Sequence, residues 1–333
     1  IMEEATEIAK LRLFLALVAS VDNVDELEPL PNIDFNIMAG NSLIGLIKVD
    51  ETAFDSVGNS KQGNLLQPLK AANYKKILED KNQSIELYKK HAFQSGEKHG
   101  TSQDSRLLML KKHIEKLNQE SQVKLNNLLL DEFNNLKIKY EEKQLTGKAK
   151  KRPLTSKDIQ DLKPFHWGYH FDKILKNGVD LIITNPPWEI FKPQAKEFFA
   201  QYSDLVTKNK MDIKTFEKQQ KKLLANPEIA EAWLEYQSQY PYVSAYYRSS
   251  EDYKNQISIV NGRKAGTDIN LYKLFLERCF HLLGDRGKCG IIIPSGIYTD
   301  LGTKQLREML FSQTNIDTLF GLSNEKFIFD TVH

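Results

Sequence analysis

The chain has 333 residues, of which 41% are hydrophobic and 27% are charged. This length corresponds to about two domains or one domain with long insertions, and the composition excludes a wholly disordered, collagen-like or disulfide-scaffold protein. The formal net charge is only +2, so a nucleic-acid partner has to be argued from local patches rather than from the whole chain.

Cysteine content and apolar runs bear on the compartment. The two cysteines, Cys279 and Cys289, suggest no disulfide framework, and a reducing cytoplasm is the natural interpretation. The longest apolar stretches, such as residues 11–19, are too short to cross a bilayer, and no secretory signal is visible. Because the chain begins with Ile1 rather than methionine, we expect it to start inside a longer protein.

The first 48 residues predict a helix followed by a strand. Residues 3–20 carry apolar side chains at helical spacing, which predicts a buried helix. Residues 33–38 alternate between apolar and polar, which predicts a short strand closed by Gly-Asn-Ser at 40–42. The helical stripe consists of Ile8, Leu11, Leu15 and Val18.

Residues 50–163 differ in composition from the rest of the chain. They are rich in Lys, Glu, Gln and Asn with periodic Leu and Ile, as in residues 107–130, and this predicts two or more long surface helices, with a helical hairpin as one arrangement. A basic cluster, Lys148 and 150–152, stands beside Pro153. We interpret it as a solvated loop; the alternative is a contact with DNA phosphates.

An α/β pattern follows. Residues 179–184 form a nearly continuous apolar run, which is typical of a strand buried on both faces of a parallel sheet. Strand and helix then alternate, which indicates a doubly wound sheet. The expected elements are polar helices over 192–240, an amphipathic helix over 270–283 with Leu271, Leu274, Phe275 and Cys279 on one face, a buried strand over 289–294 after a Gly-rich turn, a helix over 305–311 and a strand over 316–322.

Four residues directly after the first of these strands carry the chemistry. Asn185, Pro186, Pro187 and Trp188 stand where ligands bind in open α/β sheets, just beyond the carboxyl end of a strand. Two prolines stiffen the loop and keep the preceding residue extended. The Asn185 side-chain oxygen and the Pro186 carbonyl can then accept both hydrogens of one planar amino group, and Trp188 offers a face for stacking.

This arrangement suits an exocyclic amine on a nucleobase. Its two acceptors keep the nitrogen lone pair available to attack a methyl group, without a strong general base. The alternative is a rigid turn after a core strand. A bare Asn-Pro pair is no signal: we interpret Asn226-Pro227 as a helix N-cap followed by the first helical residue.

Residues 185–188 look like the catalytic motif of S-adenosylmethionine-dependent amino methyltransferases that act on adenine in DNA. The whole pattern is most similar to the large methyltransferase modules of type IIG restriction–modification enzymes and related phage-defence methylases. The resemblance covers residues 1–48, 165–191 and 266–333. Its further segments are 4–13, 36–44, 268–278, 287–295 and 306–310.

The resemblance implies an α/β fold with a Rossmann-like class I methyltransferase sheet, incomplete at its N-terminal side and carrying long helical insertions. The implied activity is site-specific methylation of the exocyclic N6 amino group of adenine. The implied organisation is methyltransferase core at 1–48, a charged helical insertion at 49–164, the catalytic strand and loop at 165–191, a second helical insertion at 192–265, and the C-terminal half of the core at 266–333.

The resemblance also assigns roles to the residues that contact the base. Asn185 and Pro186 would hold the adenine amine, while Pro187 would stiffen the loop. Trp188 and Phe329 would sandwich the base after it is flipped out of the duplex. Phe327 is the fallback for Phe329, and core packing is the alternative for either phenylalanine.

For the cofactor, S-adenosylmethionine, the resemblance implies that Ile1, Asn41 and Ser42 flank its adenine, with Phe275 nearby. Core packing is an equally open interpretation of Phe275. The family's Gly-rich cofactor loop and the acidic residue expected before Ile1 are absent. We therefore expect half of a cofactor site, with residues 1–333 alone not binding the cofactor tightly.

The implied partners are double-stranded DNA and further segments of the same protein upstream and downstream, with no membrane and a cytoplasmic location.

His166 and His170 are four residues apart, but no third ligand or cysteine pair is nearby, so we expect aromatic packing and no metal. A further cluster could contact DNA, close over the site or pack an inserted helix. It consists of Tyr240, Tyr242, Tyr246, Tyr247 and Arg248.

Two other functions stay open at this point. The same four residues could act on another planar amine, a protein glutamine side chain or a guanine in RNA. The chain could instead be a non-catalytic DNA-binding or scaffold module whose methyltransferase core has degenerated. The intact Asn-Pro-Pro-Trp sequence argues against degeneration.

Overall fold

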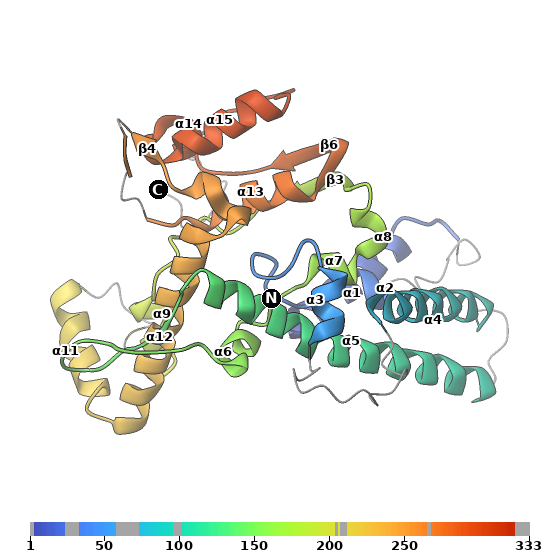
Figure 1. The fold of residues 1–333 in the computed structure, drawn as a ribbon, viewed down its shortest axis with the longest axis horizontal. Coiled ribbons are helices and arrows are strands. Elements are labelled where there is room, and N and C mark those ends of the chain that lie inside the picture. The colour runs from blue at the N-terminus through green and yellow to red at the C-terminus, as the bar shows by residue number, and fades with distance from the viewer. Residues whose placement is uncertain are drawn as a thin grey trace. The chain divides into compact units, whose positions relative to one another are not determined.

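The computed structural model describes residues 3–23, 33–57, 73–95, 101–203, 206, 212–260, 262–264 and 268–323. The chain divides into two compact units, which we describe separately (Figure 1). Unit 1 comprises Ile1–Asn135 and Leu154–Asn177, and unit 2 comprises Leu136–Pro153 and Gly178–His333. Among the described helices, none is both long and apolar enough to span a membrane.

Unit 1 is helical. Its elements are α1 (Glu3–Val18), α2 (Ile33–Asn36), α3 (Glu51–Ser56), α4 (Tyr74–Ser95), α5 (Thr101–Asn135), α6 (Ser156–Asp161), α7 (Trp167–His170) and α8 (Asp172–Leu175). The predicted helical hairpin is confirmed, because α4 packs along α5. Phe54, Tyr74, Leu125 and Tyr169, from four different helices, form a buried core cluster.

The helix predicted over residues 3–20 is present as α1, but its predicted burial is wrong. Ile8, Leu11 and Leu15 are 58%, 57% and 54% exposed. Helical spacing gathers apolar side chains on one face, whereas their burial depends on a second surface that the sequence pattern does not identify.

The strand predicted over residues 33–38 is also wrong, because the chain forms the single helical turn α2 there. The Asp34 carboxylate accepts a hydrogen bond from the Tyr88 hydroxyl at 2.8 Å and lies 3.4 Å from the Lys10 ammonium. Phe35 meets the Tyr88 ring edge-on, with centroids 5.1 Å apart. Three alternating apolar residues fit one helical turn as well as a strand, and here contacts with α4 and α1 decide between them.

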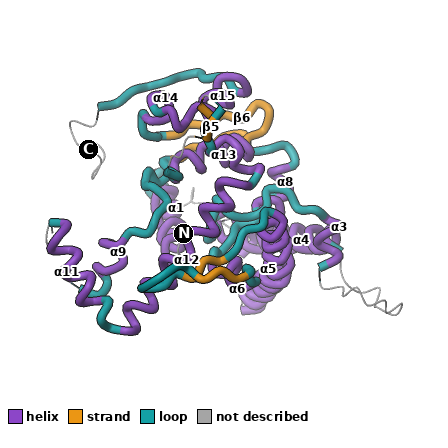
Figure 2. The backbone as a smooth tube through the Cα atoms, turned by 60° about the vertical axis from the view of Figure 1, so that its left-hand side comes forward, coloured by secondary structure: helices purple, strands orange, loops and turns teal. Residues whose placement is uncertain are grey.

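Unit 2 mixes helices and strands (Figure 2). Its elements are β1 (Tyr140–Glu142), β2 (Lys150–Arg152), β3 (Val179–Thr184), α9 (Ala195–Ala200), α11 (Ile213–Leu223), α12 (Pro227–Ser249), the 3-10 helix η2 (Glu251–Gln256), β4 (Ile259–Val260), β5 (Arg263–Lys264), α13 (Leu271–Leu282), β6 (Leu283–Ile291), α14 (Gly296–Thr299), the 3-10 helix η3 (Leu301–Thr303) and α15 (Lys304–Gln313). The helices predicted over 192–240, 270–283 and 305–311 are confirmed. Asn226 caps α12 as predicted, its side chain accepting the Glu228 N–H at 2.9 Å.

Strand β3 pairs in parallel with β6, from Leu181 opposite Lys288 to Thr184 opposite Ile291. β6 begins six residues before the predicted strand 289–294 and takes in the predicted Gly-rich turn, where the register shifts. A Cβ on Gly178 would lie 2.3 Å from the Gly284 nitrogen. Glycine is therefore required where the two strands approach most closely.

The expectation of deeply buried strands is wrong for the described chain. Leu181 and Ile183 of β3 are 58% and 79% exposed, and no described helix covers these side chains. Residues 316–322 have no hydrogen-bonded strand partner among the described residues, and Phe320 is 78% exposed. The described residues form three two-stranded sheets, of which only β3–β6 is parallel, so the expected doubly wound sheet is not seen among them. An apolar run indicates that a strand needs cover, but it does not supply that cover.

The basic cluster was predicted to be a loop, but part of it forms a strand. Its residues 150–152 form β2, which pairs antiparallel with β1 from Tyr140 opposite Arg152 to Glu142 opposite Lys150. β1 packs on α12. A separate aromatic core of unit 2 joins α9, α11 and α12 and is centred on Phe198, Phe199, Phe216 and Trp233.

Candidate active site

The Asn-Pro-Pro-Trp turn, residues 185–188, leaves the carboxyl end of β3. The Thr184 carbonyl accepts the Ile292 N–H at 3.2 Å, so the pairing of β3 with β6 continues to the start of the turn. The parallel strands therefore end at one edge, where ligands bind in open α/β sheets. Asn185 is exposed at this edge.

Asn185 is held in place by the backbone of the neighbouring residues and not by bonds of its own side chain. Pro186 is buried and Pro187 is exposed, and both rings restrict the backbone. Within the described chain, the Asn185 carboxamide has no hydrogen-bond partner. A stiff backbone thus presents an amide oxygen to solvent with its acceptor capacity available.

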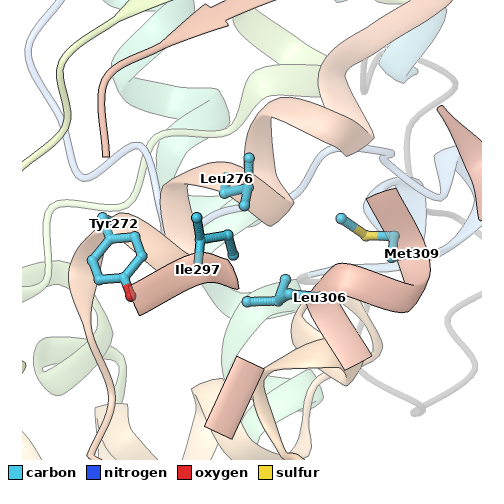
Figure 3. Packing of buried hydrophobic residues seen from close by; sticks show 5 residues of the cluster. All are labelled: Tyr272, Leu276, Ile297, Leu306 and Met309. Atoms are coloured by element: carbon cyan, nitrogen blue, oxygen red, sulfur yellow. The ribbon is translucent and has the colours of Figure 1, made fainter. Parts of the chain in front are cut away.

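Trp188 is half-buried and its indole is anchored. The Nε1–H donates to the Ile292 carbonyl at 3.2 Å, one residue beyond β6. The ring packs against a core cluster from α13, α14 and α15. The cluster consists of Tyr272, Leu276, Ile297, Leu306 and Met309 (Figure 3).

After the turn, the chain runs alongside the segment that leads into α13. Ile190 bridges antiparallel to Asn270, and the Phe191 N–H donates to the Ile269 carbonyl at 2.7 Å. The Leu271 N–H donates to the Glu189 carbonyl at 3.0 Å, so the turn is tied to the first residue of α13. The site loop therefore has two backbone supports, β6 before the turn and the α13 entry after it.

Phe191 gives the loop a third support, on α12. Its ring lies 4.8 Å from the Tyr240 ring and 5.4 Å, edge-on, from the Tyr247 ring. The Tyr240 and Tyr236 hydroxyls hydrogen-bond at 2.8 Å, and the Tyr236 hydroxyl accepts the Gln194 N–H at 3.1 Å. Phe191 was not singled out by the sequence; its only signal was an aromatic residue three positions after Trp188, with a tyrosine-rich helix to follow.

Three of the tyrosines on α12 pack the helix, which was one of the alternatives predicted for this cluster. Tyr242, Tyr246 and Tyr247 are almost fully buried, so they pack the helix rather than face a ligand. Burial raises the pKa of Tyr247 well above its ordinary value. Arg248 is exposed, and Tyr240 is half-buried against Phe191.

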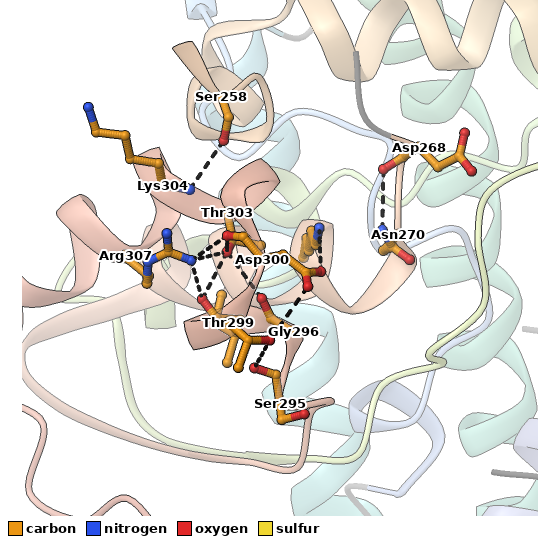
Figure 4. A network of polar contacts seen from close by, with 12 residues as sticks. Ser258, Asp268, Asn270, Ser295, Gly296, Thr299, Asp300, Thr303, Lys304 and Arg307 are labelled. Carbon is orange, nitrogen blue, oxygen red and sulfur yellow. Dashed lines mark hydrogen bonds and ion pairs between the residues drawn. The ribbon is translucent and has the colours of Figure 1, made fainter. Parts of the chain in front are cut away.

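A rigid polar turn follows β6 at the same edge of the sheet (Figure 4). Arg307 donates to the carbonyls of Ile297 and Asp300 at 3.1 and 2.6 Å, and it also contacts the Thr303 hydroxyl. The Thr303 hydroxyl in turn donates to the Ile297 carbonyl at 2.9 Å. These contacts satisfy the carbonyls at the end of α14 and hold that helix against α15.

Gly296 leaves room for two polar side chains beside this turn. A Cβ there would lie 2.7 Å from Asp300 Oδ2 and 3.1 Å from the Tyr272 hydroxyl. Burial, followed by the nearby Asp300 charge, raises the pKa of Tyr272 to about 12. Lys273 is buried with its ammonium 4.0 Å from Asp300, and burial lowers its pKa.

Helix α13 also buries charged residues that the sequence assigned to no face. The Glu277 carboxylate is fully buried and accepts hydrogen bonds from Asn255 at 2.8 Å and Gln256 at 2.7 Å. Burial raises its pKa, and these hydrogen bonds partly offset the shift. Arg278 donates to the Tyr253 hydroxyl at 2.7 Å. Because these partners lie on η2, the hydrogen bonds fix η2 on α13. This network could be found only in the tertiary structure.

The described residues that were predicted to contact the cofactor belong to both units. Asn41 and Ser42 belong to unit 1, whereas Phe275 is half-buried on α13 of unit 2. Ile1, Phe329 and Phe327 lie outside the described residues.

The Asn41 turn is held by its own side chain and backbone. The Asn41 N–H donates to the Lys163 carbonyl at 2.7 Å, and its carbonyl accepts the Phe165 N–H at 3.2 Å. Its side-chain oxygen accepts the Leu43 N–H at 3.2 Å. The Asn41 amide nitrogen and the Ser42 hydroxyl have no hydrogen-bond partner among the described residues, which leaves both available to a ligand.

Aromatic packing was predicted for both histidines and is shown for His170, whereas His166 is held by hydrogen bonds. His166 is fully buried; its Nδ1 accepts the Leu46 N–H at 3.2 Å and its Nε2 lies 3.0 Å from the Asn126 side-chain oxygen. His170 stacks on Phe165 with centroids 4.8 Å apart. Burial lowers the pKa of His166 to about 3, so the ring is neutral near pH 7. No metal-binding cluster occurs among the described residues.

Surface hollows in unit 1 do not coincide with the predicted site. One lies between α4 and α5 beside Leu87 and Met109, and another lies between α3 and α5 beside Ala53 and Leu128. Neither is lined by a predicted site residue. We therefore identify the candidate site by the chemistry and exposure of the Asn185 turn and not by these hollows.

Comparison with known proteins gives a consistent result. Residues 241–329 match the family model described as Eco57I restriction-modification methylase. The chain is 30% identical over 223 residues to a protein of Methanocaldococcus jannaschii named as a type II restriction enzyme and methyltransferase. That alignment covers 59% of this chain and 18% of the relative, so the chain spans less than a fifth of that protein's length. No solved structure matches the chain.

Proposed function

We propose that this chain, a restriction–modification methylase module, transfers a methyl group from S-adenosylmethionine to the N6 amino group of adenine in double-stranded DNA. One observation carries the proposal. The Asn185 carboxamide is exposed and without a partner among the described residues, at the end of β3 on a double-proline turn. The β3–β6 pair would then belong to a larger Rossmann-like sheet.

The turn can hold an amino group through two acceptors. The Asn185 side-chain oxygen and the Pro186 carbonyl would each accept one hydrogen of the planar –NH2 group. This leaves the nitrogen lone pair directed away from both acceptors. Once the N–C bond forms, the nitrogen would carry a positive charge and release one proton to solvent. Asn185 would therefore act as a hydrogen-bond acceptor, and no ionisable neighbour would have to act as a strong base.

Trp188 would supply the flat surface for the base. Adenine N6 is hidden in the duplex, so the base has to be extruded by about 180° at a cost of a few kcal/mol. The anchored indole can return part of that cost, because base–aromatic stacking contributes about 1–3 kcal/mol. Phe329 would contact the opposite face of the base, with Phe327 as the fallback.

For the adenine of S-adenosylmethionine we propose contacts in each unit separately, Asn41 and Ser42 in unit 1 and Phe275 in unit 2. The Asn41 amide nitrogen and the Ser42 hydroxyl can hydrogen-bond ring nitrogens, and half-buried Phe275 offers an apolar edge. Ile1 would complete this set. When bound, the cofactor supplies an electrophilic methyl group on a positively charged sulfur.

The proposal extends to the protein that contains this chain. We infer a larger restriction–modification or phage-defence protein, because the matched relative is more than five times as long as the aligned segment. We propose that this protein works in the cytoplasm, where its DNA substrate would be. Segments upstream and downstream of the chain would contribute to cofactor binding and to DNA sequence recognition.

The test uses the full-length parent protein, duplex DNA and S-adenosylmethionine with a labelled methyl group. DNA is then digested to nucleosides, and the label is expected in N6-methyl-2′-deoxyadenosine. Asn185→Ala should abolish this incorporation while DNA binding survives, and Asn315→Ala, at an exposed asparagine elsewhere in unit 2, should not. Near-normal incorporation by Asn185→Ala would refute the proposal.

The same assay separates the other activities that the turn could support. Label in protein glutamine or in RNA guanine, with none in DNA, would assign the turn to another planar amine. DNA binding without transfer to any of these substrates would indicate a non-catalytic DNA-binding module.

A further inference from the structure

The segment that we call the basic hairpin, residues 137–152, concentrates positive charge. It holds seven lysines and arginines against two glutamates, a net charge of +5 in a chain whose total is +2. The rest of the chain is therefore slightly acidic. Its basic residues are Lys137, Lys139, Lys143, Lys148, Lys150, Lys151 and Arg152.

Only part of this charge is neutralised within the protein. Glu141 pairs with Lys151 at 2.9 Å and with Lys143 at 3.9 Å. Lys139, Lys148 and Lys150 are exposed, and no carboxylate of the described chain lies within 4.0 Å of their ammonium groups. The hairpin thus presents several solvated ammonium groups that are not paired with acidic side chains.

The hairpin is held in a fixed position on α12. The Arg152 guanidinium lies over the Tyr140 ring at 3.8 Å, and the Tyr140 ring packs against Tyr242 of α12 at 5.4 Å. The Lys143 N–H donates to the hydroxyl of Ser238, also on α12, at 2.8 Å. The basic side chains therefore belong to a hairpin that is packed on α12 rather than to a free chain.

The same helix supports the candidate active site. Tyr240 and Tyr247 of α12 pack against Phe191, which follows the Asn-Pro-Pro-Trp turn by three residues. Tyr242, which carries the hairpin, lies between them in sequence on α12. Helix α12 therefore supports both the basic hairpin and the loop that carries Asn185.

We propose that the basic hairpin binds the phosphate backbone of the duplex whose adenine is held at Asn185. This inference rests on the proposed function and adds a sequence-independent binding surface to it. Lysines neutralise phosphates and release condensed counterions, which contributes affinity without reading bases. The one large exposed apolar side chain in the hairpin is Leu145, which is too little for insertion into a lipid surface.

The test is the salt dependence of DNA binding by the full-length parent protein. Lys139→Gln/Lys148→Gln/Lys150→Gln removes three ammonium groups that have no carboxylate partner in the described chain. Binding to non-specific duplex DNA is followed by fluorescence anisotropy between about 50 and 200 mM NaCl. The slope of log K against log salt is negative, and each lost phosphate contact should lower its magnitude by about 0.9, so the magnitude should fall by up to about 2.7.

Matched variants separate a local contact from a general charge effect. Lys112→Gln/Lys116→Gln/Lys157→Gln removes the same charge from exposed positions of unit 1 and should leave the slope unchanged. The corresponding triple arginine variant of the hairpin should keep the wild-type slope. At saturating DNA, the glutamine hairpin variant should keep its kcat while its KM for DNA rises severalfold.

Three results would overturn the inference. The magnitude of the slope could be unchanged in the hairpin variant, or it could fall by the same amount in the unit 1 control as in the hairpin variant. Phosphatidylserine vesicles could bind the wild type through the hairpin lysines while DNA binding is unaffected. Each result leaves the proposed function standing if the wild type still methylates adenine, whereas failure of the proposed function appears as absence of methyl transfer by the wild type.

Discussion

Two asparagine turns in this chain use the same residue type in different ways. Asn41, in unit 1, is engaged through its N–H, its carbonyl and its side-chain oxygen, all within the protein. Asn185, in unit 2, has an exposed carboxamide with no partner in the described chain, and prolines and neighbouring backbone hold it in place. The first side chain stabilises its own turn, whereas the second is positioned by its surroundings. Only the second leaves its acceptor oxygen fully available for chemistry.

The largest expected effect comes from Asn185→Ala in the full-length protein. Loss of one preorganised polar group at a reacting centre costs about 100- to 1,000-fold in kcat. Because the side chain supports nothing within the described chain, the melting temperature should stay unchanged. A clear loss of stability would break the comparison, since Asn185 would then also be structural.

Trp188→Ala should affect both binding and stability, because the indole is anchored and half-buried. Loss of base stacking should weaken DNA binding by roughly 1–3 kcal/mol, or about 5- to 150-fold. Trp188→Phe keeps a stacking surface but loses the bond to the Ile292 carbonyl, so it should retain most of the affinity and lose about 1 kcal/mol of stability. Equal binding defects in the two variants, measured by anisotropy, would argue against stacking.

Acid should destabilise unit 1 through His166, whose Nδ1 accepts the Leu46 N–H just beyond the Asn41 turn. Burial lowers its pKa in the folded state to about 3, from an ordinary value of 6.5. Below pH 6.5 the unfolded chain binds a proton that the folded chain does not. The contribution of His166 to the free energy of unfolding should therefore be retained above pH 6.5 and should fall as the pH drops toward 3, by up to about 1.4 kcal/mol per pH unit. Burial also lowers the pKa of His170 in this unit to about 3, so His170 should add to the fall.

The measurement is urea unfolding of unit 1, followed from about pH 7.5 to about pH 5.5. His166→Gln keeps a polar side chain without an imidazole, so it should be less stable at neutral pH and show a flatter pH dependence. An unchanged pH dependence in this variant would mean that another group is responsible.

The smallest expected effect is that of Asn41→Ala. This variant loses the acceptor for the Leu43 N–H while the backbone bonds to Lys163 and Phe165 remain, so stability should fall by about 1 kcal/mol. Urea midpoints of unit 1 provide the measurement. A fall in stability without any change in cofactor affinity would restrict Asn41 to a structural role and leave Ser42 as the cofactor contact in that turn.

Several elements could be predicted because their signals are local. The cap at Asn226-Pro227, the α4–α5 hairpin and the helices α13 and α15 follow from spacing and capping within a few residues. Strand β3 with the turn after it could be recognised in the same way. Asn185 stands at the end of that strand as predicted, although its role stays a prediction.

Elements that depend on a partner surface were predicted less well. Residues 33–38 were expected to form a strand and form α2, because contacts of Asp34 and Phe35 with Tyr88 favour a helical turn. The exposed stripe of α1 and the exposed face of β3 show that an apolar pattern does not specify what covers it. Buried Glu277 and Arg278 were missed because charged residues are normally assigned to solvent unless partners distant in sequence are known.

The sequence by itself determined the chemical groups of the candidate site and the stiffness of their loop, since proline geometry and amide hydrogen bonding are properties of single residues and their neighbours. Tertiary structure alone decided what holds that loop: β6, the entry to α13, and the α12 tyrosines around Phe191. The physical reason is that backbone restriction acts between adjacent residues. Packing and cross-chain hydrogen bonds instead depend on residues that only folding brings together.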